Sequence, residues 1–140
     1  MPYNIRDSYL ENRILGASPL ELVAILYQEA SKSVREAIGQ LDAGDIRARS
    51  RAVTRAQLIL MELVNSLDLE AGGSIARSLA ELYDYMQIRL TEANAAQSRK
   101  QLEEVARLLG ILEEGWKQCA AAETDLSGGE RQAAEVMHAF

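Results

Sequence analysis

Apolar residues recur every three to four positions through most of the chain, which is the periodicity of amphipathic α-helices. Four such segments follow one another, at about residues 19–41, 46–67, 74–93 and 100–122, with short polar or glycine-containing stretches between them. Helices of about twenty residues joined by short connections must alternate in direction. The sequence therefore predicts an all-α protein built on an antiparallel up-down four-helix bundle, spanning residues 18–122.

Local capping signals support these boundaries. Ser18 precedes Pro19, and Glu21 lies three residues after Ser18, so this stretch predicts a capping box with proline at the first helical position. Gly44 is placed to end the first helix, and Asp45 to cap the second. Gly72 and Gly73 predict a turn before the third helix.

The apolar stripes of the middle two helices predict most of the core. In the second segment the stripe consists of Val53, Ala56, Leu60, Leu63, Val64 and Leu67. In the third it consists of Ile75, Leu79, Leu82 or Tyr83, Met86, Leu90 and Ala93.

The two ends of the chain do not continue this pattern. Residues 1–17 lack a sustained period but contain several large apolar side chains, so they predict either a frayed terminus or, as we prefer, a strap, short helix or lid that docks onto the bundle. Residues 123–140 predict a C-terminal tail that forms a short amphipathic turn or stays mobile.

Charge and composition exclude several classes of function. The formal net charge of −6 and the pI of about 4.9 argue against nucleic acid as a partner. The single cysteine, Cys119, excludes an internal disulfide and fits a reducing compartment. The N-terminus has no apolar signal-peptide region, and no run approaches the roughly 20 apolar residues of a membrane span. We expect a cytoplasmic protein without membrane insertion.

The sequence offers little for catalysis. Its only histidine is His138, and it contains no Glu-x-x-His repeat, no Cys-x-x-Cys, no Gly-x-Ser-x-Gly and no phosphate-binding loop. Arg47, Arg51 and Arg55 form an i, i+4 row that is either a solvated face, which we prefer, or a basic ligand-binding row. We expect no enzyme activity, no metal and no cofactor.

A second set of apolar residues falls outside the core stripes. Leu58 and Met61 do so on the second helix and Tyr85 and Ile88 on the third, while Ile25 and Ile111 are single cases on the other two. Two adjacent helices with such patches are typical of a groove for a partner helix. Bundle flanks or a homodimer interface are the alternatives. We place Leu63 and Leu82 at the edges of the groove and expect the N-terminal Tyr9, Ile14 and Leu15 to cover it when it is empty.

Several motifs resemble the FliS family of flagellin-specific export chaperones. They are ASPLELV at 17–23 with Leu26-Tyr27, Gly44-Asp45, SLDLEAGGSIA at 66–76, LYDYM at 82–86 with Arg89-Leu90, Ala93-Asn94 and Trp116-Lys117. The similarity runs from about Tyr9 to Ala120, and the block from Gly72 to Asn94 is its most specific part. Gln28-Glu29 departs from the Asp-Gly that often follows Leu-Tyr in the family.

The resemblance implies an antiparallel helical bundle in the bacterial cytoplasm that binds the disordered C-terminal segment of flagellin. Such a chaperone prevents premature polymerisation and assists delivery to the flagellar type III export apparatus, whose gate is a second expected partner. A tyrosine in an N-terminal strap contributes to the binding surface in the family, and Tyr9, with Ile14, matches its position. We expect a monomer or weak dimer when free.

Overall fold

The computed structural model describes residues 5–124, and for residues 5–9, 19 and 120–124 it describes the backbone alone. Five α-helices make up this part of the chain: α1 (Ile5–Leu15), α2 (Pro19–Ala43), α3 (Ile46–Ser66), α4 (Gly73–Ala96) and α5 (Arg99–Thr124). No strand occurs within residues 5–124. The predicted tail from residue 125 onward, His138 included, lies outside the described residues.

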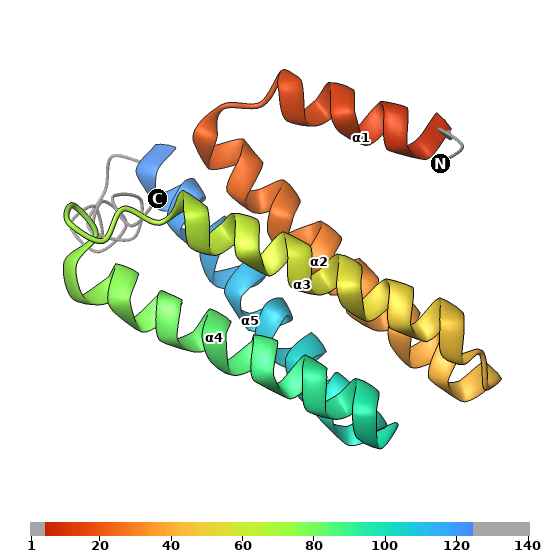
Figure 1. The fold of residues 1–140 in the computed structure, drawn as a ribbon. Helices are drawn as coiled ribbons and strands as arrows, with labels where there is room; N and C mark the ends of the chain where they lie inside the picture. The colour runs from red at the N-terminus through yellow and green to blue at the C-terminus, as the bar shows by residue number, and fades with distance from the viewer. Residues whose placement is uncertain (1–4, 125–140) are drawn as a thin grey trace.

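The four long helices form a closed ring (Figure 1). Helix α2 packs on α3 and α5, and α4 completes the ring by packing on the same two helices. Each connection within the bundle is short, so sequential neighbours run antiparallel. The predicted all-α fold is confirmed, and the predicted helix ends lie within three residues of the observed ones.

Local hydrogen bonds explain where the helices begin and end. The Ser18 hydroxyl accepts from the Glu21 N–H at 3.2 Å, and the Glu21 carboxylate accepts from the Ser18 N–H at 3.4 Å, so the predicted capping box is present. Helix α2 ends at Gly44 with φ +74°, and α4 begins at Gly73 with φ +55°. Both angles favour glycine because it lacks a Cβ atom. Gln97 takes φ +55° without that advantage at the end of α4.

Aromatic side chains tie α2, α4 and α5 together inside the bundle. The hydroxyls of Tyr27 and Tyr83 are hydrogen-bonded. The rings of Tyr27 and Trp116 pack edge to face with their centroids 6.4 Å apart, and the Trp116 indole N–H donates to the Leu20 carbonyl at 3.3 Å. Burial raises the pKa of Tyr27 to about 12, and burial together with the neighbouring Tyr27 raises that of Tyr83 further. Both phenols therefore stay neutral in the folded protein at any ordinary pH.

A buried arginine adds a polar link between α3 and α4. Arg49 is almost fully buried; its Nε donates to the Asn94 side-chain oxygen at 3.0 Å and its Nη2 to the Asn94 carbonyl at 3.3 Å. That carbonyl lies in the last turn of α4, where backbone acceptors lack helical partners and a positive charge is favourable. Asn94, one of the motif residues, therefore has a structural role here.

Two core predictions are wrong. Ile25, predicted to lie outside the core, is buried on the side of α2 where Arg13 of α1 lines the same small cavity. Val64, predicted as core, is exposed in the last turns of α3.

Candidate functional site

Large apolar side chains remain exposed on the outer sides of α3 and α4. The exposed fractions are 57% for Leu58, 54% for Met61 and 51% for Ile88, with Tyr85 at 42%. We call Leu58, Met61 and Ile88, with Tyr85 at the edge next to α5, the outer apolar surface. Single exposed apolar residues are ordinary in soluble proteins, but several on adjacent helices indicate a binding surface.

Hydrogen bonds between α3 and α4 fix how these residues line up. The Gln57 amide donates to the Thr91 hydroxyl at 2.9 Å, and the Gln87 amide donates to the Gln57 carbonyl at 2.8 Å. In an antiparallel pair, this register sets Leu58 level with Ile88, and Met61 level with Tyr85, along the bundle axis. The structure therefore brings the patches predicted on these two helices to the same height on the molecule.

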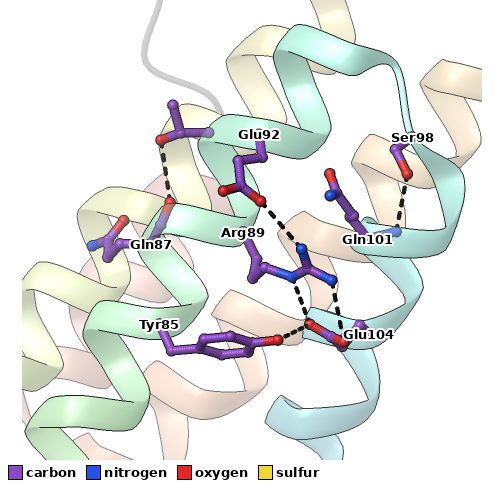
Figure 2. Close-up of polar contacts among 8 residues, drawn as sticks. Tyr85, Gln87, Arg89, Glu92, Ser98, Gln101 and Glu104 are labelled. Atoms are coloured by element: carbon purple, nitrogen blue, oxygen red, sulfur yellow. Dashed lines mark hydrogen bonds and ion pairs between the residues drawn. The ribbon is translucent and has the colours of Figure 1, made fainter.

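Tyr85 points away from α3 and toward α5 (Figure 2). Its hydroxyl donates to Glu104 at 2.7 Å, Arg89 Nε donates to the same carboxylate at 2.8 Å, and the Arg89 guanidinium lies 5.7 Å from the centre of the Tyr85 ring. Arg89 also donates to Glu92 at 3.2 Å. The tyrosine is thus fixed by α5, and the predicted groove between α3 and α4 does not contain its ring.

The same contacts shift the ionisation of the two partners. The hydrogen bonds from Arg89 and then Tyr85 lower the pKa of the Glu104 carboxyl below its usual value. The hydrogen bond to the ionised Glu104 raises the pKa of Tyr85. At neutral pH the carboxylate is charged and the phenol neutral, which is the pair of states that favours this hydrogen bond.

Leu63 and Leu82, which were predicted at the edges of the groove, are less exposed than a partner-binding role requires. Leu63 is fully buried in the core, because it lies on the side of α3 that faces the other helices, so its assignment as a partner-binding residue is wrong. Leu82 is partly buried and packs against the core. It therefore offers a partner less surface than Leu58 or Ile88.

The described N-terminal helix does not cover the outer apolar surface. After the short connection that follows Leu15, α1 and α2 diverge (Figure 1). A cavity of about 310 Å³ lies between Arg13 and the α2 residues Glu21, Ala24, Ile25 and Gln28. Leu15 is 77% exposed and Ile14 is also exposed. The predicted cover over Leu58 and Ile88 is therefore wrong for this arrangement. The Tyr9 side chain lies outside the described residues.

Within residues 5–124, no group of three or more His, Cys, Asp or Glu side chains gathers in a way that would hold a metal ion. None of the helices there has both the length and the apolar character that crossing a bilayer requires. Cys119 is a free, partly buried thiol.

Comparison with known proteins gives one consistent result. The model of the family described as flagellar protein FliS matches residues 2–123. The flagellar secretion chaperone FliS of Salmonella typhimurium is 39% identical over 110 residues, which cover 78% of this chain and 82% of that protein. FliSB of Pseudomonas aeruginosa is 33% identical over 107 residues, 76% and 85% of the two chains. FliS of Bacillus subtilis is 29% identical over 120 residues, 86% and 89% of the two chains.

Proposed function

This chain belongs to the FliS family of flagellar proteins, and from that membership and its outer apolar surface we propose that it is an export chaperone whose client is the C-terminal segment of flagellin. Its relatives named flagellar secretion chaperones support the role in flagellar export. We name flagellin as the protein whose export it assists. Binding of flagellin to the outer apolar surface would keep it from polymerising before export.

The exposure of Leu58, Met61 and Ile88 carries this proposal. The bundle already has a closed core, in which the residues facing inward from the same two helices are fully buried. The outer residues, each more than half exposed, therefore add less to the packing of the free chain than the inner ones. Full burial of such a side chain is worth about 1.5–3 kcal/mol. Because these side chains are about half exposed, a partner gains about half of that for each one it covers.

A disordered client suits such a shallow surface. A segment that folds on binding loses conformational entropy and must bury a large area to compensate. The outer apolar surface presents its residues at the same height on two antiparallel helices, which fits an amphipathic helix with apolar residues at i, i+3, i+4 and i+7. Contacts spread over two helices can also be released one by one at the export gate, the second partner that we propose.

The first test is a titration of the full chain with a synthetic peptide of the flagellin C-terminal segment. We expect one-to-one binding with a gain in helicity by circular dichroism, because the peptide folds on the surface. Sedimentation of the free chain separates this function from a homodimeric bundle. A stable dimer that buries Leu58 and Ile88, together with unchanged spectra on adding peptide, would reject the chaperone proposal.

A matched pair of variants tests the position of the site. Ile88→Asp should weaken peptide binding at least tenfold, because it places a charge in an apolar contact. Ile111→Asp, the same change at an exposed isoleucine of α5, should leave the affinity close to that of the wild type. Equal losses in both variants would show that the client does not distinguish the two faces.

The cellular location follows from the proposed function. A chaperone that keeps flagellin from assembling before export must meet it where it is made, so we place this protein in the cytoplasm. The acidic net charge and the absence of a catalytic constellation in the sequence agree with a binding protein rather than an enzyme.

A further inference from the structure

An open surface depression of about 910 Å³ lies along the outer side of α3, next to the outer apolar surface, and all of its described lining residues belong to α3. Two neighbouring i, i+4 rows line it. One row consists of Ile46, Ser50, Thr54 and Leu58. The other consists of Arg47, Arg51 and Arg55. We call this depression the arginine channel. Leu58 belongs both to it and to the outer apolar surface, so the two are continuous.

The three arginines of the channel differ in their partners. Arg55 donates to Glu29 of α2 at 3.2 Å, so the bundle already neutralises its charge. Arg47 and Arg51 are exposed, and neither makes a hydrogen bond or ion pair with any residue of the described part of the chain. The Asp45 carboxylate caps the N-terminus of α3 by accepting from the Ala48 N–H at 3.0 Å, and Arg47 lies in the first turn, which contains no acidic side chain. Among the described residues 5–124, nothing pairs with these two positive charges, although the formal net charge of the chain is −6.

We propose that the arginine channel binds an acidic stretch of the client chain, adjacent to the apolar stretch that lies on the outer apolar surface. This inference rests on the proposed function and names the chemistry of the client. Carboxylates of the client pair with Arg47 and Arg51, whose planar guanidinium groups suit two-point contact with a carboxylate. An apolar side chain of the client packs on Ile46 at the far end.

The dimensions of the channel set the length of that stretch. Ile46 and Leu58 are twelve positions apart on α3, which corresponds to about 18 Å along the helix axis. A client helix covers this distance in about three turns, and an extended client in about five or six residues. The client sequence recognised here therefore has at least two acidic residues within about three helical turns of its apolar anchor.

Exposed charge pairs act more on specificity and on the association rate than on affinity. Reversing both free arginines replaces two attractive contacts by two repulsive ones, and we expect the affinity to fall about tenfold at low salt. The difference should shrink at high salt, because ions screen exposed charges beyond about 3 Å at 1 M ionic strength.

The test uses the full chain and the peptide of the flagellin C-terminal segment, made once with its natural acidic residues and once with each replaced by the corresponding amide. The variant is Arg47→Glu with Arg51→Glu. The matched control is Arg35→Glu with Arg77→Glu, which changes the net charge equally at exposed arginines of α2 and α4 outside the channel. Peptide affinity is measured by fluorescence anisotropy at low and high salt.

The channel variant should bind the natural peptide about tenfold more weakly than the control variant, and the two should bind the amide peptide equally. If the channel and control variants bind the natural peptide with the same affinity while Ile88→Asp abolishes binding, the channel is not used and the proposed function stands. If the wild type does not bind the peptide at all, the proposed function and this inference fall together.

Discussion

The inner and outer sides of α3 and α4 contain similar residues in opposite environments. Each side has leucine, methionine and tyrosine, yet the inner residues are fully buried and the outer ones are close to half exposed or more. The inner set is Leu60, Leu63, Tyr83 and Met86, and the outer set is Leu58, Met61, Tyr85 and Ile88. Position on the helix, rather than residue type, therefore separates the residues that hold the fold from those available to a partner.

The difference between the inner and outer sides is tested by shortening one leucine on each side of α3 to alanine. Leu63→Ala should lower the free energy of unfolding by about 2–5 kcal/mol, because it leaves a cavity in a closed core. Leu58→Ala should change it by less than about 0.5 kcal/mol, because the side chain already meets water. Urea denaturation measures both, and equal losses would mean that the outer leucine is part of the core.

Alkaline pH should destabilise the protein chiefly through the buried tyrosines of the inner side. Tyr27 has a pKa of about 12 when folded and 10 as an ordinary tyrosine, so the unfolded chain loses this proton first as the pH rises. The stabilisation is complete below pH 10 and is lost as the pH rises toward 12, by up to about 2.7 kcal/mol for this residue. Urea midpoints at pH 8, 10 and 11 test this. Tyr27→Phe should show a weaker decline than the wild type, and an identical decline would contradict the assignment.

The Arg49–Asn94 link offers a prediction of intermediate size. Asn94→Ala removes the side-chain acceptor of a buried guanidinium and should lower the free energy of unfolding by about 1–3 kcal/mol. Thr91→Ala, one turn earlier on α4, removes a hydroxyl that is exposed and should have a smaller effect. Thermal unfolding of the two variants provides the measurement, and the larger loss in Thr91→Ala would show that Arg49 does not depend on Asn94.

The smallest expected effect concerns the edge of the outer apolar surface. Tyr85→Phe keeps the ring but removes its hydrogen bond to Glu104, so the ring is no longer fixed toward α5. Tyr85→Phe should lower the peptide affinity by about two- to fivefold. Tyr85→Ala should lower it further because the aromatic surface is lost. Calorimetric titration distinguishes these variants. A larger effect of Tyr85→Phe than of Tyr85→Ala would mean that the hydroxyl, rather than the ring, contacts the client.

Most of the fold could be predicted because its signals are local. The capping box at Ser18, the glycine at 44 and the 3.6-residue period of the core each depend on residues within one or two turns. Leu58, Met61 and Ile88 were found in the same way, since a helical wheel needs only the spacing of one helix.

The errors arise where a residue depends on distant neighbours. Ile25 is buried on the side of α2 where Arg13 of α1 lines the same small cavity, and the ring of Tyr85 turns toward α5 because Glu104, nineteen positions away, accepts its hydrogen bond. Arg49 falls on the same helical stripe as Val53, Ala56 and Leu60, and Asn94 on the next helix supplies the partner that its buried guanidinium requires. The spacing of one helix contains no information about these partners.

The role of the outer apolar surface is decided by a calorimetric titration of the flagellin C-terminal peptide into the wild type and into the double variant Leu58→Asp with Ile88→Asp. We expect one-to-one binding to the wild type, no detectable heat with the double variant, and melting temperatures within a few degrees of each other. A double variant that stays folded and binds the peptide as tightly as the wild type would contradict this role.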